Sequence, residues 1–140
     1  MLTKLFLLPL FLHLILIFWV GTRLLKARVK AIRGGTAKMS EIASDSSAWP
    51  RKVKLLGNNF DSQFDTPTLW YAVSALVVAL QMVDLAFIAL SWIFILTRYA
   101  HSFVHTGNND VPSRMRIFMF GLFTVAAMWF WMGVQLFFMR

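Results

Sequence analysis

Cysteine is absent from the 140 residues of this chain. Without it the chain can form no disulfide framework, no cysteine nucleophile and no thiolate metal site, so any sulfur chemistry has to use a thiol carried by a ligand. Acidic residues are scarce as well, with six Asp and Glu against 14 Lys and Arg. Charged residues make up 14% of the chain, whereas soluble domains carry about 25%. This composition excludes an ordinary soluble domain.

Apolar residues dominate what is present. They form 59% of the sequence, which includes 14 Phe and six Trp, and the mean hydropathy is +0.65. The length is that of one domain. We therefore expect an all-α integral membrane protein in which residues 1–140 form a single domain embedded in the lipid bilayer.

The first apolar run covers residues 5–20 and carries no charge. A signal peptide places its charge before such a run and a small-residue cleavage site after it. Here Lys4 is the only leading basic side chain, no cleavage site follows, and basic residues accumulate from Arg23 onward. The pattern predicts a retained transmembrane helix over about residues 5–22.

Residues 23–58 form the long polar segment that follows, and this region holds most of the Lys and Arg of the chain. The pair Gly34-Gly35 and the Ser-rich stretch 40–47 are typical of a loop. Basic loops between membrane spans lie on the cytoplasmic side. We therefore expect residues 23–58 to be a cytoplasmic loop.

The apolar stretch 69–96 is too long for one span. About 28 residues extend about 42 Å as a helix, against a hydrocarbon core of about 30 Å. Two helices joined by a turn near residues 81–84 fit better. The Thr66-Pro67 pair is a helix-start signal, and after the turn-rich residues 106–112 a final uncharged run follows, with Ser113 as a possible helix cap. The sequence therefore predicts a four-transmembrane-helix bundle, with helices at about 5–22, 59–81, 84–105 and 115–138.

The basic charges also indicate an orientation. The loop 23–58 and the shorter loop near Arg114 and Arg116 lie on one side only if two crossings separate them. Both chain termini are then expected on the non-cytoplasmic side. Short loops and the lack of a retention signal favour a bacterial inner membrane, although a eukaryotic internal membrane would give the same topology.

Four basic side chains lie at or near the end of the third predicted helix. Arg98, His101 and His105 are spaced i, i+3 and i+7, which places them on one helical face, and Arg114 follows after a short loop. Ionisable groups at membrane depth are costly and indicate function, although interfacial snorkelling would produce the same spacing. Polar residues near the start of the second predicted helix lie at the same level: Asn58, Asn59, Asp61, Gln63 and Asp65.

Two other classes of site receive little support. His101 and His105 are separated by Ser-Phe-Val, without the Glu of the zinc-protease pattern, and no third ligand is evident, so we predict no metal. A small drug/proton exporter needs a carboxylate within the membrane, and the only candidate, Asp84, falls at a predicted turn. We expect His13 to be a hydrogen-bonded packing residue and Gln135 to link helices.

The order of these residues resembles a known family. The segment Arg98-Tyr-Ala-His101-Ser-Phe-Val-His105, followed by Pro112 and Arg114, resembles the junction of helices 3 and 4 in the MAPEG family, the membrane-associated proteins in eicosanoid and glutathione metabolism. The segment 59–63 ahead of Pro67 resembles that family's Asn-x-x-Glu before a proline. The segment 28–35, Arg-Val-Lys-Ala-Ile-Arg-Gly-Gly, is similar to its bacterial members, and the similarity covers nearly the whole chain.

The resemblance implies a four-helix membrane bundle assembled as a homotrimer, with glutathione bound between subunits as the cosubstrate. Arg114 would be the catalytic residue that faces the glutathione sulfur. The partners implied are a second and third copy of the chain, glutathione and a lipophilic small molecule, and no nucleic acid. The glutathione-binding residues implied by the resemblance are Arg28, Arg51, Asn59, Gln63, Arg98, His101 and His105.

Two functions follow from this resemblance. The first is a glutathione-dependent transferase or peroxidase acting on lipophilic electrophiles that arrive from the bilayer. The alternative is a noncatalytic membrane scaffold or ligand-binding protein that keeps the MAPEG fold. Two substitutions leave this alternative open: His105 stands where the family often has Tyr, and Gln63 stands where it has Glu.

Overall fold

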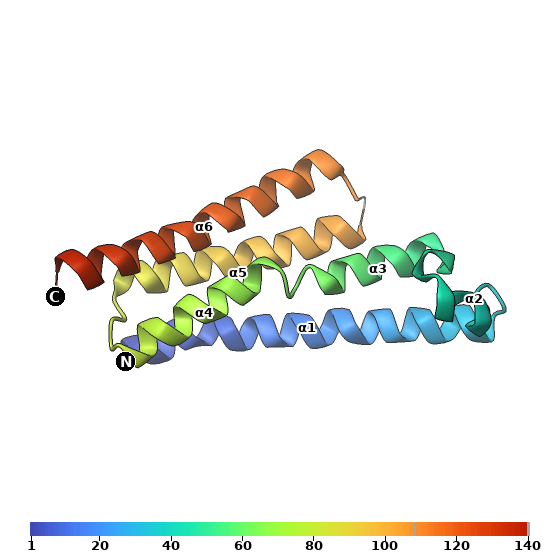
Figure 1. Ribbon diagram of the computed structural model, residues 1–140, viewed down its shortest axis with the longest axis horizontal. Coiled ribbons are helices and arrows are strands. Elements are labelled where there is room, and N and C mark those ends of the chain that lie inside the picture. The colour runs from blue at the N-terminus through green and yellow to red at the C-terminus, as the bar shows by residue number, and fades with distance from the viewer. Residues whose placement is uncertain (108, 140) are drawn as a thin grey trace.

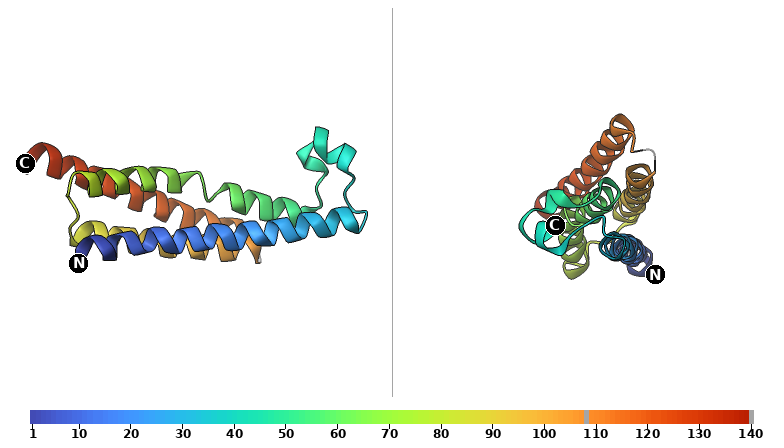
Figure 2. Two further views of the ribbon diagram at one scale, coloured as in Figure 1. Left: turned by 90° about the horizontal axis from the view of Figure 1, so that it is seen from below. Right: turned by 90° about the vertical axis from the view of Figure 1, so that its right-hand side faces the viewer.

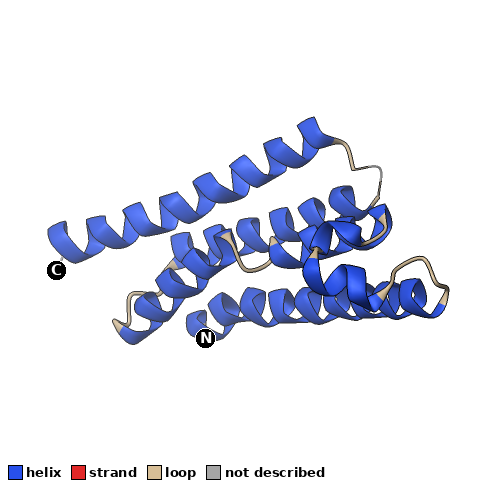
Figure 3. Ribbon diagram, turned by 45° about the vertical axis from the view of Figure 1, so that its right-hand side comes forward, coloured by secondary structure: helices blue, strands red, loops and turns tan. Residues whose placement is uncertain are grey.

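The computed structural model describes residues 1–107 and 109–139, and all of the regular structure in these ranges is helical (Figure 3). Four rods, α1, α4, α5 and α6, lie side by side, and the two chain termini lie at the same end of the bundle (Figure 1). This confirms the predicted all-α class. The elements in chain order are α1 (Leu2–Arg33), α2 (Met39–Ser44), the 3-10 helix η1 (Ser46–Ala48), α3 (Arg51–Asp61), α4 (Thr66–Ala79), α5 (Leu85–Thr106) and α6 (Val111–Phe138).

Three helices, α1, α5 and α6, are long and apolar enough to cross a membrane. Large apolar side chains on their outer surfaces point away from the bundle: Phe18 is 68% exposed and Phe130 is 73% exposed. A continuous apolar exterior of this kind suits lipid rather than water. Together with helix length, it confirms an integral membrane protein.

Helix α1 is longer than predicted. We expected it to end near residue 22, where the apolar run stops, but it continues to Arg33. Residues 22–33 are mostly Leu, Lys, Arg and Ala, which are strong helix formers, so polarity ends the membrane span without ending the helix. Gly34 is the C-cap, and Gly35, the next residue, has φ +68. There the N–H of Thr36 donates to the carbonyl of Ala31 at 3.0 Å, as in a Schellman motif.

The predicted loop 23–58 is therefore largely helical. It contains the last turns of α1, then α2, η1 and most of α3. Helix α3 returns along the extension of α1, and both reach beyond the ends of α5 and α6 (Figures 1 and 2). A small apolar cluster, which includes Leu24, Ala31, Val53 and Leu56, holds the two helices together.

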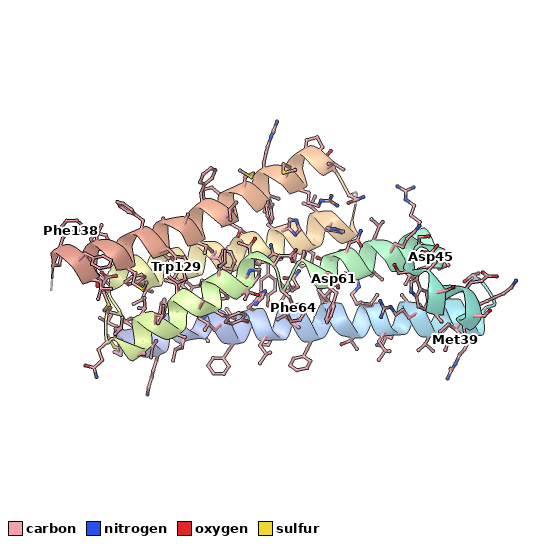
Figure 4. All side chains as sticks on the ribbon, viewed as in Figure 1. Met39, Asp45, Asp61, Phe64, Trp129 and Phe138 are labelled. Atoms are coloured by element: carbon pink, nitrogen blue, oxygen red, sulfur yellow. The ribbon has the colours of Figure 1, made fainter. Side chains whose placement is uncertain are left out.

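The second predicted span, 59–81, is not one helix. It is divided into the end of α3 and the separate helix α4, with a break over residues 62–65, where Figure 4 labels Asp61 and Phe64. Pro67 lies in the first turn of α4 and disfavours helical geometry at the residue before it. Helix α4 has 14 residues and extends about 21 Å, which is less than the ~30 Å thickness of the hydrocarbon core.

The remaining boundaries lie near those predicted. The turn between α4 and α5 contains Gln81 at φ 55, and Met82 N–H donates to the Val77 carbonyl at 2.8 Å. Gln81 thus occupies the left-handed position that glycine usually takes. Helix α6 begins at Val111 rather than at 115. Its cap is Asp110, whose carboxylate accepts from Ser113 N–H at 3.0 Å, and hydrogen bonding to Ser113 lowers the pKa of Asp110.

Asp84 links α5 to α6 at the end of the bundle that contains the α4–α5 turn. One carboxylate oxygen caps α5 by accepting from Phe87 N–H at 2.9 Å. The other accepts from the Trp131 indole at 2.8 Å and from the Gln135 amide at 2.5 Å. The predicted turn position of Asp84 and the predicted linking role of Gln135 are confirmed.

We predict that Asp84→Ala destabilises the protein by about 2–3 kcal/mol, because it removes a helix cap and leaves two donors on α6 without an acceptor. Asp84→Asn keeps the cap oxygen and replaces the other oxygen with a donor, so it should have an intermediate effect. Thermal unfolding of the detergent-purified protein, followed by circular dichroism, measures both. Equal melting temperatures for Asp84→Ala and the unsubstituted protein would contradict this role.

Candidate functional site

Two apolar clusters are separated along the bundle axis by a layer of buried polar side chains. The larger cluster includes Trp70, Phe94 and Met128, and the smaller one is the α1–α3 cluster described above. The polar layer is contributed by α1, the end of α3, the α3–α4 break and α5. Its buried members are His13, Asn59, Gln63, Arg98, His101, Ser102 and His105.

Arg98 lies at the centre of this layer and is only 2% exposed. Its guanidinium donates to the backbone carbonyl of Ser62 at 2.7 Å and to the Ser62 hydroxyl at 3.2 Å. Ser62 is the C-cap of α3, where carbonyls lack intrahelical donors and carry the negative end of the helix dipole. Arg98 therefore caps α3 from the neighbouring helix, and the break between α3 and α4 makes that carbonyl available.

Gln63 connects Arg98 to α1. Its Nε2 donates to the Asn59 carbonyl at 2.9 Å, which fixes the orientation of the amide. Its Oε1 then faces Arg98 at 3.4 Å and His13 Nε2 at 3.2 Å. Since Oε1 can only accept, His13 Nε2 carries the proton, and His13 Nδ1 accepts from the Tyr71 hydroxyl at 2.7 Å. Hydrogen bonding thus selects one neutral tautomer of His13.

Asn59 links α3 to α5. Its amide nitrogen donates to the Ser102 hydroxyl at 2.9 Å, and both side chains are fully buried. Sequence analysis predicted Asn59 and Gln63 for this site but did not single out Ser62, Ser102 or Tyr71. Serine and tyrosine carry no distinctive signal in an apolar sequence. The hydrogen bonding predicted for His13 is confirmed, and its partner Gln63 connects it to the predicted site.

A cavity of about 240 Å³ opens beside this layer. Its polar lining comes from Ser62, His101, His105 and Arg114, and its apolar lining from α6 residues such as Phe118. The two imidazole rings have centroids 5.7 Å apart. His101 and His105 are 5% and 4% exposed, and within the described residues the Nδ1 atom of each has no hydrogen-bond partner. Both imidazole rings line the cavity, and an imidazole nitrogen can donate or accept a hydrogen bond, so the cavity is suited to a polar ligand.

Arg114 faces this cavity from α6. It is half-buried, and its guanidinium donates to the Asn109 side-chain oxygen at 2.9 Å. Asn109 has φ 52, a left-handed conformation that Asn tolerates better than most residues. No carboxylate lines the cavity among the described residues. With one guanidinium and two imidazoles on its walls, the cavity favours an anionic or polar ligand.

Two predicted residues lie elsewhere in a single chain. Arg28 is on the extension of α1, with its guanidinium 5.4 Å from the centre of the Trp49 ring. Arg51 is the first residue of α3 and is exposed. Neither lines the cavity, so their role in glutathione binding stays a prediction. Within the described part of the chain, no group of three or more His, Cys, Asp or Glu side chains is arranged to hold a metal ion.

Comparison with known proteins identifies one family. The sequence model of the MAPEG family matches residues 6–134, which is nearly the whole chain. Neither the curated proteins nor the solved structures contain a match. The matched range includes all of the polar layer and the cavity beside it. On this match, the chain belongs to the MAPEG family.

Proposed function

We propose that the protein is a glutathione-dependent transferase or peroxidase acting on lipophilic electrophiles. The observation that carries this proposal is the cavity in which Arg114 faces the buried pair His101 and His105 without a carboxylate. Members of the MAPEG family include enzymes of this kind. The chain itself has no cysteine, so the thiol of such a reaction comes from glutathione.

The chemistry required of the site is stabilisation of a thiolate. A free thiol has a pKa of about 8.5 and is only a few per cent ionised at neutral pH. A guanidinium beside the sulfur favours the ionised form, and lowering the thiol pKa by about two units takes roughly 2.7 kcal/mol. The thiolate then forms a bond to an electrophilic carbon, and the bond to the leaving group breaks with its electron pair. Arg114 is the residue we assign to the sulfur.

His101 and His105 supply polar contacts to the remainder of the tripeptide. Their rings line the cavity and can bond its amides or carboxylates, because each ring nitrogen serves as donor or acceptor according to tautomer. Arg98 is engaged by Ser62 and Gln63 and does not line the cavity. We therefore assign Arg98 the role of positioning the end of α3 beside the cavity, while the two histidines and Arg114 contact the ligand.

One chain provides only part of the site. The cavity of about 240 Å³ is smaller than the ~300–1,000 Å³ of small-molecule sites. A neighbouring subunit in a homotrimer would supply the missing wall, where Arg28 and Arg51 are available to bind carboxylates as bidentate donors. The basic extension of α1 and α3 would attract the anionic tripeptide.

The direct test of this proposal is ultraviolet difference absorbance of the purified protein during titration with glutathione. Because the chain has no cysteine, a thiolate band can arise only from the ligand. We predict a saturable band that disappears in Arg114→Ala, with turnover of a model electrophile reduced by about 10²-fold or more. Arg116→Ala is the matched control, since Arg116 lies two residues away on α6 and outside this cavity; it should keep the band.

A band of equal size in Arg114→Ala would contradict the role given to Arg114. If the unsubstituted protein binds glutathione without any thiolate band, or does not bind it, the noncatalytic scaffold or ligand-binding function replaces the enzymatic one.

His13 provides a second prediction, as a positioning residue that acts through Gln63. His13→Ala leaves the Tyr71 hydroxyl without its partner and Gln63 less constrained, so we expect a loss of about 1–3 kcal/mol of stability. We also expect a several-fold rise in KM for glutathione with the pKa of the bound thiol unchanged. Tyr71→Phe removes only the outer hydrogen bond and should have a smaller effect. Steady-state kinetics over a pH series measures this, and a shifted thiol pKa with an unaltered KM would rule out a positioning role.

A further inference from the structure

A second cavity, of about 540 Å³, lies between the extension of α1 and the first half of α3. This part of the molecule projects beyond α5 and α6 (Figures 1 and 2). The base of the cavity is apolar and includes Ala27, Val53 and Leu56. The last two belong to the small α1–α3 cluster, so the cavity has a packed apolar base.

The rim of this cavity is basic. It carries the exposed side chains of Arg23, Lys26, Lys30 and Lys52, and no Asp or Glu contributes to the lining among the described residues. Within the described residues, Lys38 and Glu41 form an ion pair at 3.2 Å, and neither of them lines the cavity. The four rim cations therefore act together on any anion that enters the cavity.

The level of the cavity relative to the membrane follows from α1. Trp19 is the last aromatic residue of the apolar run, and such residues lie at the membrane–water interface. The Arg23 guanidinium stacks over the Trp19 ring at 4.7 Å and is the first charge after the run. Residues 23–27 rise about 6 Å, which matches the ~5–7 Å headgroup layer on each side of a bilayer. The membrane-proximal half of the cavity thus lies at the depth of lipid phosphates.

We propose that this cavity binds the phosphate headgroup of an anionic phospholipid. The rim cations neutralise the phosphate, the apolar base contacts the glycerol portion, and the acyl chains continue into the bilayer past Trp19 and the neighbouring Phe103, whose ring centroid is 5.8 Å from that of Trp19. Basic pockets at this depth in membrane proteins select anionic headgroups. A zwitterionic headgroup would place its own cation among the rim cations and is disfavoured. This cavity shares no lining residue with the cavity beside Arg114.

Native mass spectrometry of the full chain in a nonionic detergent tests the proposal, with phosphatidylglycerol and phosphatidylcholine of identical acyl chains added in equal amounts. We expect preferential retention of phosphatidylglycerol. In Lys26→Gln/Lys30→Gln, the affinity for phosphatidylglycerol should fall about 30-fold, from about 1 kcal/mol for each cation lost. The matched control Lys38→Gln/Lys54→Gln removes the same charge from the same region outside the cavity, and it should change the affinity by less than about twofold.

Three results would overturn this proposal. Equal retention of the two lipids would show that the protein does not distinguish their headgroups. Equal losses in the two double variants would indicate a general charge effect rather than this cavity. Displacement of phosphatidylglycerol by an equal concentration of soluble glycerol phosphate would identify a site for a free anion. Because all four lysines are exposed, both variants should melt as the unsubstituted protein does, and the comparison stays valid.

Discussion

A buried guanidinium in the membrane-embedded half of the bundle sets the main constraint on this structure. Arg98 is 2% exposed, and a buried charge of this kind is tolerated only where acceptors replace its water. The principal acceptor is the Ser62 carbonyl at the end of α3. A continuous helix over residues 59–81 would have used that carbonyl internally. The break between α3 and α4 and the burial of Arg98 therefore depend on each other.

The polar layer built on this contact is positively biased. Gln63 offers Arg98 and His13 a neutral oxygen, and its amide nitrogen donates to Asn59, which a carboxylate could not do. Within the described residues, no Asp or Glu is buried in the layer or lines the adjoining cavity. Because the layer separates two apolar clusters, it also fixes the register of α1, α3 and α5. The same hydrogen bonds thus determine both the packing of the bundle and the charge of the site.

Much of this was predictable from sequence, for identifiable reasons. Uncharged runs located the three helices that are long enough to span a membrane, and the i, i+3, i+7 spacing placed Arg98, His101 and His105 on one face. The end of α1 was missed because charge marks the edge of a membrane while leaving helix propensity intact, and the Gly34-Gly35 signal was assigned to a loop. The break at residues 62–65 was missed although Thr66-Pro67 marked the start of α4, because the contact of Ser62 with Arg98 has no signal in the sequence. The turn at Gln81 lacks the glycine that would have identified it.

The most direct test of this account is amide hydrogen exchange over residues 59–66 in Arg98→Met, compared with the unsubstituted protein in the same detergent. Met retains a long apolar side chain and removes the cap on α3. The account predicts that protection of these amides falls by about tenfold or more, while protection in α6 is unchanged and Arg116→Met, the matched control, has no effect. Unchanged protection in an intact Arg98→Met protein would show that the break between α3 and α4 is organised without Arg98, and would contradict the account.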